Sequence, residues 1–420
     1  MASATNTKIV SSPLLVLLLF SLYTSSAEET GTTLTSSTEE KNVFVLDNYG
    51  ARGDGEHDDT QALAKAWNAA CSSSRPASSL LVPKGNTYLL KPVTLSGPCK
   101  SSITFNVKGT LLAPPSRSDW TQDTIRHWIM FQGVSDLTVT GGGTVDGNGE
   151  IWWKNSCKTN EALPCTEAPT ALTFHQCDNL KVDNLRILNS QQIHLSVEDC
   201  ANVRVSRLSI TAPGTSPNTD GIHVTRSTDV QVRDCAIKTG DDCLSIEDGT
   251  RNLHVTKVVC GPGHGISIGS LGDDDSRAEV SGVTIDSVQL YGTTNGARIK
   301  TWQGGSGYAK DIVFQNIVMD NVQNPIIIDQ SYCDSAKPCE DQESSAVEIS
   351  NIVFKNIRGT TASKDAIKLS CSQNAPCSDI ALENIELKLE GGDGDPESTC
   401  QNAKWRKSGN VVPSPCKGSN

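Results

Sequence analysis

The sequence predicts an all-β fold, a single-stranded right-handed parallel β-helix with an N-terminal capping helix. Three observations favour this fold. Short strands recur at intervals of 23 to 27 residues, a second set of short strands runs in step with the first, and no helical periodicity fills the gaps between them. A period of this length with several short strands in each unit is typical of a solenoid.

The strands of the two sets begin at related residues. In the first set each strand starts near an Asn or Asp, at Asn179, Asn202, Asp229, Asn252, Asp311 and Asn351. Strands of the second set start at Ile193, Ile222, Leu244, Ile266, Ala297, Ile326 and Ile367. A leucine-rich repeat has a similar period but needs a ladder of leucines, whereas Ile, Val and Leu share the apolar positions here. We therefore predict stacked coils about 4.8 Å apart, with Ile222 and Val224 inside and His223 outside.

One segment before the repeats carries the signals of a helix. Residues 58–71 begin with Asp and Thr residues of the kind that cap helices, and Leu63 and Trp67 lie on one helical face. Because a solenoid must cover its open end, we predict that this helix is the N-terminal cap.

The N-terminus has the pattern of a secretory signal. Lys8 is followed by the apolar run 13–22, and the small residues Ser25 and Ala27 predict cleavage after Ala27. An uncleaved anchor is the alternative, but the run is too short to span a bilayer. We predict a signal peptide over residues 1–27, a Ser/Thr-rich flexible arm over 28–40 and the β-helix domain over 41–420. The protein is then secreted and extracellular, with no membrane partner after cleavage.

The chain has 15 cysteines, which in a secreted protein indicate disulfide bonds. The close spacings predict four short loops, and two longer pairings are further candidates: Cys157–Cys165, Cys333–Cys339, Cys371–Cys377, Cys400–Cys416, and then Cys243–Cys260 and Cys71–Cys99. Cys177, Cys200 and Cys235 are left over. The odd total requires at least one thiol that is free or bonded between chains, and we favour a buried structural thiol.

The charge of the chain bears on its partners. The formal net charge is -12, and the sequence has no basic run of the kind that follows nucleic-acid phosphates. We therefore expect no nucleic-acid partner, and we expect a monomer.

The register of the second strand set brings charged residues together. When Ile222, Leu244, Ile266 and Ala297 are equivalent, the residues two positions earlier are Asp220, Asp242, His264 and Asn295. Asp241 then stands beside this column. Arg298 and Lys300 face outward, on the same side as His223, Ser245 and Ser267. Residues about 22 apart in the sequence should thus meet within a few ångströms.

Carboxylates placed this close cannot all ionise freely, because like charges raise at least one pKa. A carboxylic acid beside a carboxylate is what acetal hydrolysis requires, since one group protonates the leaving oxygen and another activates water. Arg298 and Lys300 would bind an anionic substrate. For any single Asp a solvated turn residue is the better explanation, but the phased set with His, Arg and Lys favours a catalytic site.

Four motifs in order resemble those of the plant polygalacturonases, a family of pectin-degrading glycoside hydrolases. These motifs are Asn218-Thr-Asp220, Gly240-Asp-Asp242, Gly263-His-Gly265 and Arg298-Ile-Lys300. The stretches 260–272 (CGPGHGISIGSLG) and 298–307 (RIKTWQGGSG) are also similar to the family's sequences, and the resemblance runs from Phe44 to the C-terminus.

The resemblance implies a right-handed parallel β-helix and hydrolysis of α-1,4 bonds in polygalacturonic acid with inversion, without a metal or other cofactor. By motif, Asp241 is the general acid, Asp220 and Asp242 hold and activate water, and His264 tunes the protonation of the acid or holds the site together. Arg298 and Lys300 would hold a galacturonate carboxylate. Asn218 would line the sugar site, and Tyr332 matches a substrate-binding tyrosine or is a packed loop aromatic. It also implies action in the plant cell wall.

Three alternatives stay open at this point. A pectate lyase shares the β-helix but cleaves by elimination, with Ca²⁺ on acidic ligands. A wall protein could bind pectin without cleaving it. The motifs also do not separate endo from exo attack, although we favour endo. Inverting enzymes usually hold their carboxylates about 6.5–9.5 Å apart, and stacked coils could bring them closer, so inversion rests on the resemblance.

Overall fold

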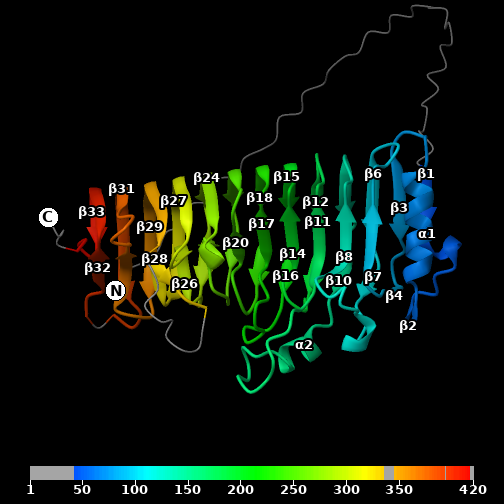
Figure 1. Ribbon diagram of the computed structural model, residues 1–420, viewed down its shortest axis with the longest axis horizontal. Helices are drawn as coiled ribbons and strands as arrows, with labels where there is room; N and C mark the ends of the chain where they lie inside the picture. Colours follow the sequence, from blue (N-terminus) through cyan, green and yellow to red (C-terminus); the bar gives the residue numbers. More distant parts are fainter. Residues whose placement is uncertain (1–41, 335–344, 393, 417–420) are drawn as a thin grey trace, which may run out of the picture. The chain divides into compact units, whose positions relative to one another are not determined.

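The computed structural model describes residues 42–334, 345–392 and 394–416. Its strands pair in parallel, and successive coils lie side by side in chain order from β1 at one end to β33 at the other (Figure 1). They form three ladders, each adding one strand per coil. Residues 1–41 lie outside the described part, so the predicted signal peptide and flexible arm stay predictions.

The first ladder and the second ladder merge at one strand. The first ladder contains β1 (Asn42–Val45), β3 (Ser78–Val82), β6 (Ile103–Val107), β9 (Leu137–Thr140), β12 (Lys181–Asp183), β15 (Ala201–Ser206), β18 (Thr228–Arg233), β21 (Arg251–Thr256), β24 (Arg277–Asp286), β27 (Ser306–Val322), β29 (Ala346–Thr361), β31 (Cys377–Leu389) and β33 (Ala403–Val412). The second contains β2 (Asp54–Asp58), β4 (Thr87–Leu89), β7 (Thr110–Leu112), β10 (Thr144–Asp146), β13 (Arg186–Leu188), β16 (Ser209–Thr211), β19 (Ala236–Lys238), β22 (Val259–Cys260) and β25 (Gln289–Tyr291). Both β24 and β25 pair with the long strand β27, where the two ladders become one.

The third ladder carries the residues of the predicted column. It contains β5 (Val93–Ser96), β8 (His127–Gln132), β11 (Thr170–His175), β14 (Leu195–Glu198), β17 (Ile222–Thr225), β20 (Leu244–Ile246), β23 (Ile266–Leu271), β26 (Asn295–Trp302), β28 (Asn324–Tyr332), β30 (Asp365–Ser370) and β32 (Glu397–Gln401). Ile222, Leu244, Ile266 and Ala297 are in register, as predicted. The prediction for Ile193 was wrong by two positions, because Leu195 pairs with Ile222.

The Asn and Asp residues at the strand starts have a backbone reason. Asn179, Asn202, Asp229 and Asn252 all have φ between 53° and 56°, a left-handed conformation that Asn and Asp tolerate better than other side chains. Their side chains also join neighbouring coils, since Asn202 Nδ2 donates to Asn179 Oδ1 at 2.7 Å. The repeat in the sequence is therefore a repeat of left-handed residues at the strand starts.

The interior of the coils is apolar and close-packed. Ile222 and Val224 are fully buried while His223 between them is partly exposed, as the alternation predicts. Aromatic rings also stack along the coils: Phe131 and Phe174 on adjacent strands lie 5.2 Å apart and nearly parallel. Burial of a large apolar side chain contributes roughly 1.5–3 kcal/mol, so this continuous core supplies most of the stability.

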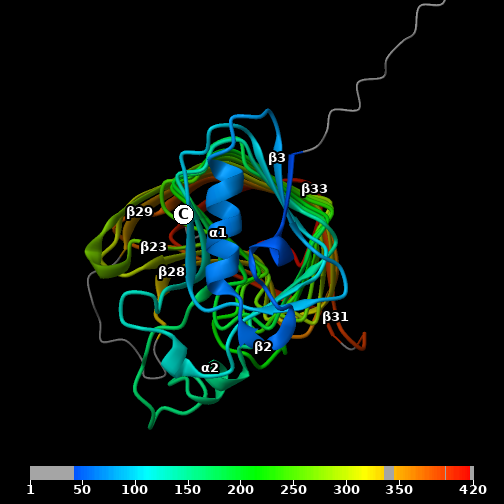
Figure 2. The ribbon, with the colours of Figure 1, turned by 90° about the vertical axis from the view of Figure 1, so that its right-hand side faces the viewer.

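The predicted capping helix is α1 (Thr60–Cys71), which lies across the end of the coils (Figure 2). Leu63 and Trp67 are buried against the core, as predicted. The helix begins two residues later than expected, because the Asp59 carboxylate accepts hydrogen bonds from the backbone N–H groups of Arg52 and Gly53 in the preceding loop.

The remaining helical segments were not predicted. They are α2 (Glu150–Lys154) and the 3₁₀ turns η1 (Leu46–Tyr49), η2 (Arg117–Asp119) and η3 (Asp273–Asp275). α2 lies in the long connection between β10 and β11. No helix in the described part of the chain is long and apolar enough to cross a membrane.

Five of the predicted disulfides form in the structure: Cys71–Cys99, Cys157–Cys165, Cys243–Cys260, Cys371–Cys377 and Cys400–Cys416. Cys339 lies outside the described residues, so its pairing with Cys333 stays a prediction. Cys177, Cys200 and Cys235 are free and buried, as expected for structural thiols.

Candidate active site

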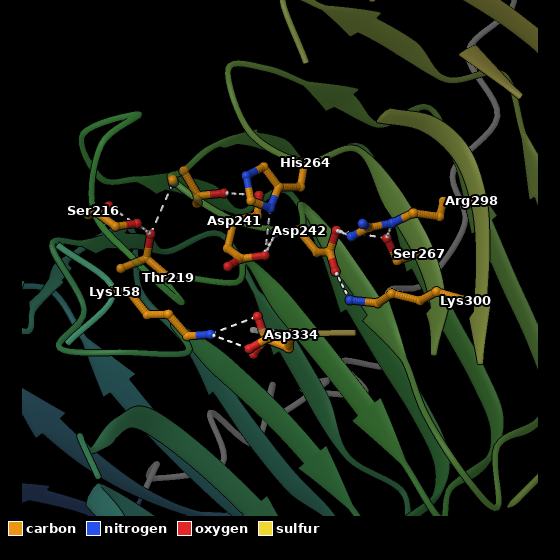
Figure 3. Close-up of polar contacts among 12 residues, drawn as sticks. Lys158, Ser216, Thr219, Asp241, Asp242, His264, Ser267, Arg298, Lys300 and Asp334 are labelled. Atoms are coloured by element: carbon orange, nitrogen blue, oxygen red, sulfur yellow. Dashed lines mark hydrogen bonds and ion pairs between the residues drawn. The ribbon is translucent and has the colours of Figure 1, made fainter. Parts of the chain in front are cut away.

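The site lies on the outer face of the third ladder and on the turns that enter its strands (Figure 3). Backbone hydrogen bonds stack these turns on each other: Gly221 N–H donates to Asp242 O at 2.9 Å, and Cys243 N–H donates to Gly265 O at 2.8 Å. The disulfide from Cys243 to Cys260 ties the same turn to the next one. Asp220, Asp242 and His264 therefore meet in space although they are about 22 residues apart in the sequence.

Gly240 allows the close approach of two of these turns. A Cβ at this position would lie 1.9 Å from the Ser216 carbonyl oxygen, and the Gly240 N–H donates to Thr219 Oγ1 at 3.0 Å. Any side chain here would push the coil that carries Asp241 and Asp242 away from the coil that carries Asp220.

Asp241 is paired with His264 on the next coil. Nδ1 of His264 lies 3.0 Å from Asp241 Oδ1, and the His264 backbone N–H donates to Asp241 O at 2.7 Å. Burial would raise the pKa of Asp241, but the hydrogen bond and positive charge of His264 outweigh it and hold that pKa below its usual range. Burial would likewise lower the pKa of His264, but Asp241 raises it. Both shifts favour an ionised Asp241 beside a protonated His264, an ion pair with the proton on the imidazole.

Asp242 is paired with two cations. Its Oδ1 accepts from Arg298 Nη2 and from Ser267 Oγ, each at 2.7 Å, and its Oδ2 lies 3.1 Å from Lys300 Nζ. The Asp242 side chain is only 1% exposed. Two cations face one carboxylate, so one positive charge is in surplus, which suits an anionic ligand.

Asp220 is the carboxyl group whose pKa rises most clearly in this cluster. Burial, together with the like charges of Asp241 and Asp242, raises its pKa well above the usual range. The sequence predicted that at least one pKa in the set would be raised, and burial with the neighbouring carboxylates places this rise at Asp220. In the free protein this group retains its proton to higher pH than an ordinary aspartic acid.

His194 supports Asp220 and was not predicted. Its backbone N–H donates to the Asp220 carbonyl at 2.8 Å, and its ring Nδ1 lies 2.9 Å from the same oxygen. Burial lowers the pKa of His194 to about 4, so the ring is neutral. The mistaken phase of Ile193 concealed this contact, because it put His194 beside His223 rather than behind Asp220.

All eight predicted residues line one cavity of about 360 Å³: Asn218, Asp220, Asp241, Asp242, His264, Arg298, Lys300 and Tyr332. Lys300 Nζ also lies 4.9 Å from the centre of the Tyr332 ring, a cation–π contact. Sequence reasoning missed Glu247, which lines the same cavity and whose pKa burial raises to about 7. A Glu directly after an apolar strand gives no signal of its own.

One cluster has the composition of a metal site. One ligand atom from each of Asp241, Asp242 and His264 lies within 4.8 Å of the others. Their donors are already engaged, since His264 Nδ1 contacts Asp241 and both oxygens of Asp242 contact cations. Two neighbouring cations also repel a third, so this donor set fits an internally paired cluster better than a Ca²⁺ site.

Known proteins resemble this chain over most of its length. Residues 71–412 match the glycosyl hydrolases family 28. A polygalacturonase of Persea americana is 55% identical over 347 residues, which are 83% of this chain and 74% of the relative. A polygalacturonase of Solanum lycopersicum is 51% identical over 373 residues, 89% of this chain and 80% of the relative.

Solved structures agree in fold. An endo-xylogalacturonan hydrolase from Aspergillus tubingensis is 26% identical with a TM-score of 0.74, covering 87% of this chain and all of that one. A polygalacturonase from Erwinia carotovora is 24% identical with a TM-score of 0.69, covering 84% of this chain and 94% of that one. The shared right-handed β-helix and the extent of the family match lead to one conclusion: the chain belongs to the glycosyl hydrolases family 28.

Proposed function

We propose that this protein is a secreted polygalacturonase that hydrolyses α-1,4 bonds between galacturonate residues of de-esterified pectin, by endo attack and with inversion. The observation that supports it most is the single cavity that joins paired carboxylates to Arg298 and Lys300 on a family 28 fold. The carboxylates suit hydrolysis of an acetal, and the surplus positive charge suits a polyanion.

In this proposal Asp241 protonates the glycosidic oxygen as the bond to the anomeric carbon breaks. The pKa shifts favour an ionised Asp241 and a protonated His264, so in this proposal the proton comes from the pair rather than from Asp241 alone. His264 Nδ1–H passes its proton to Asp241, and Asp241 passes one to the leaving oxygen. This is a proton-tuning role for His264.

Water attacks the anomeric carbon and gives its proton to a carboxylate. Asp242 has both oxygens engaged by cations and Ser267, so neither oxygen is free to accept a proton from water. Asp220 has a raised pKa and hence a stronger affinity for a proton. We propose that Asp220 accepts the proton and that Asp242 orients the water while neutralising Arg298 and Lys300.

The substrate contacts follow from the charges around the cavity. Arg298 and Lys300 would each contact both Asp242 and one galacturonate carboxylate. Tyr332 would cover the sugar beside Lys300, and Asn218 would contact the hydroxyls of that sugar. The wall of the plant cell is the proposed place of action, supported by the disulfides, and we propose that a monomer suffices because one chain supplies all of these residues.

Inversion is supported by the family rather than by the spacing. Inverting enzymes usually hold the acid and base carboxyl groups roughly 6.5–9.5 Å apart, and this range applies to Asp241 and Asp220 in the proposal. The water-orienting Asp242 lies closer to the acid, with one of its oxygens within 4.8 Å of an oxygen of Asp241. A direct observation of the first product anomer by NMR is therefore part of the test.

The test uses purified protein on de-esterified polygalacturonate with a chelator present. We expect new reducing ends without unsaturated uronides, a steep early fall in viscosity, and a product with inverted anomeric configuration. A slow viscosity fall would mean exo attack. Unsaturated product that appears only with Ca²⁺ would identify a lyase, and binding without cleavage would identify a pectin-binding wall protein.

A further inference from the structure

Glu247 is an acidic residue of the catalytic cavity that the proposed reaction does not use. It lines the cavity together with Lys300 and Tyr332, and it is partly exposed rather than sealed in the core. An ionised carboxylate at this place would repel an anionic ligand. A fourth carboxyl group in a cavity proposed to bind a polyanion therefore needs a physical explanation.

The strand register places Glu247 at the same level as Lys300. Ser245 on β20 pairs with Ser267 on β23, and Ser267 pairs with Arg298 on β26. Glu247 comes two residues after Ser245, and Lys300 comes two residues after Arg298. Because side chains alternate along a strand, both Glu247 and Lys300 lie on the outer face that carries the cavity.

The strand between Glu247 and Lys300 has a β-bulge. Its register on β26 shifts by one residue between Ile268 and Leu271, so Gly269 and Ser270 together lie opposite Lys300. The backbones are close here, since a Cβ on Gly269 would lie 2.1 Å from the Lys300 carbonyl oxygen. The bulge thus adds backbone and no large side chain between Glu247 and Lys300.

Glu247 lies among charged groups without forming an ion pair. Among the described residues no cation contacts its carboxylate, because Arg298 and Lys300 both contact Asp242. Burial raises the pKa of Glu247 to about 7, and the positive charge of Lys300 only partly offsets this rise. The charged and titratable groups that face Glu247 or line the same part of the cavity are Asp242, Lys300, Asp273 on η3, His223 on β17, Tyr332 on β28 and Asp334.

The charges near Lys300 show what Glu247 can do. Arg298 and Lys300 carry two positive charges and their partner Asp242 carries one negative charge, which leaves one positive charge in surplus. Ionised Glu247 would cancel this surplus, whereas uncharged Glu247 leaves it in place. The protonation state of Glu247 therefore sets the net charge of the site that would hold a galacturonate carboxylate.

We propose that Glu247 is a specificity-determining residue of this site. Its uncharged form leaves the positive charge of Arg298 and Lys300 available to a substrate carboxylate, and its ionised form repels that carboxylate. This inference rests on the proposed function. It adds to that function a residue that makes the binding of an anionic sugar depend on pH.

The test measures binding of trigalacturonate by calorimetry at about pH 5.5 and about pH 8.5, on either side of the pKa of Glu247. The two proteins are Asp241→Asn and Asp241→Asn with Glu247→Gln, because Gln has the shape of the uncharged acid and cannot ionise. The Kd of the first divided by that of the second should rise roughly three- to tenfold from the lower to the higher pH, since one repulsive charge is removed. The titrations of Asp220 and His264 are common to both proteins and cancel in this ratio.

Glu198 provides a matched control. It lies at the end of β14 on the same ladder, accepts a hydrogen bond from Ser196 Oγ at 2.7 Å, and is not among the residues that line the catalytic cavity. Glu198→Gln removes a negative charge from the same face, away from Lys300. The corresponding ratio for Glu198→Gln should therefore stay the same at both pH values.

Two further measurements keep the test independent of one variant. Glu247→Met also removes the charge and should give the same rise in the ratio, with the melting temperature showing that each variant is folded. In turnover, kcat/KM of Glu247→Gln on polygalacturonate, divided by that of the wild type, should rise over the same pH range.

The outcomes separate this inference from the proposed function. Ratios that do not change with pH for Glu247→Gln and Glu247→Met, or an equal rise for Glu198→Gln, would overturn the role of Glu247 alone. A wild type that cleaves no polygalacturonate, together with an Asp241→Asn variant that binds no trigalacturonate at either pH, would overturn the proposed function as well.

Discussion

At the scale of residues, two adjacent aspartates have different surroundings. Asp241 contacts His264 near the surface of the cavity, where His264 is 39% exposed. Asp242 is buried between Arg298 and Lys300. One of these adjacent carboxylates therefore contacts an imidazole and the other contacts two cations. We expect substitutions of Asp241 and Asp242 to have different effects on activity and stability.

Asp241→Asn should abolish hydrolysis while leaving the fold intact. The amide keeps the shape of the side chain but cannot relay a proton, and general acid catalysis contributes roughly 10²–10⁴-fold. We expect kcat to fall by at least that factor, the free energy of unfolding to change by less than about 1 kcal/mol because the pair with His264 is partly exposed, and oligogalacturonide binding to persist. Retained activity in this variant would contradict the assignment of Asp241 as the acid.

The neighbouring variant Asp242→Ala is the control for the small stability change expected of Asp241→Asn. It leaves two buried cations without their carboxylate, which costs about 3–5 kcal/mol. Chemical denaturation should show that loss for Asp242→Ala and not for Asp241→Asn. Equal stabilities would mean that the ion pairs of Asp242 are far weaker than their burial implies.

At the scale of elements, a loop from an early coil reaches a late one. Lys158, in the connection between β10 and β11, contacts Asp334 just after β28, with Nζ 2.7 Å from Oδ1 and 3.0 Å from the carbonyl oxygen (Figure 3). Asp334 lines the catalytic cavity. The contact joins connections that come before and after the coils carrying Asp220 to Lys300.

Lys158→Ala should change access to the site more than it changes stability. The side chains of Lys158 and Asp334 are 37% and 49% exposed, and such surface pairs contribute about 0–1 kcal/mol. We expect the free energy of unfolding to change by no more than that. Release of this contact should lower KM for the polymer while KM for trigalacturonate stays the same, measured from reducing ends. A variant with equal changes for both substrates would show that the contact does not restrict the polymer.

At the scale of the whole molecule, buried groups with opposite shifts compete as pH changes. The neutral ring of His194, with a pKa near 4 against 6.5 when unfolded, stabilises the fold fully above about pH 6.5 and loses that contribution as pH falls toward 4. Asp220 and Glu247 have raised pKa values, so their buried carboxyl groups favour the fold more as pH falls. These two pH dependences offset each other. The raised pKa values of Asp220 and Glu247 favour the folded state at acidic pH.

The activity should follow a bell-shaped pH profile with its maximum below about pH 8. Asp220 must lose its proton to act as a base, so activity rises as pH increases through its elevated pKa. His264 must keep its proton to supply Asp241, and activity falls as pH increases through the raised pKa of His264. The measurement is kcat/KM on polygalacturonate across the pH range in buffers of constant ionic strength. A maximum above about pH 8 would count against these protonation states.

Much of this molecule could be predicted from the sequence because one coil repeats another. A parallel β-helix has one register per coil, so the intervals between Ile222, Leu244 and Ile266 were enough to align Asp220, Asp242 and His264. The Asn and Asp residues at the strand starts mark each repeat because only a few residue types tolerate a left-handed backbone there.

The tertiary structure alone decided what the side chains and loops do. The pairing of Asp242 with both cations, the raised pKa of Asp220 and the support from His194 depend on distances between coils. The contact of Lys158 with Asp334 depends on the 147–169 connection, which has no period. Strand periodicity fixes which residues share a face, because alternation and stacking are properties of the backbone. Hydrogen bonds, burial and pKa shifts depend on how irregular segments fold back over that face. Local sequence patterns do not predict the path of these segments.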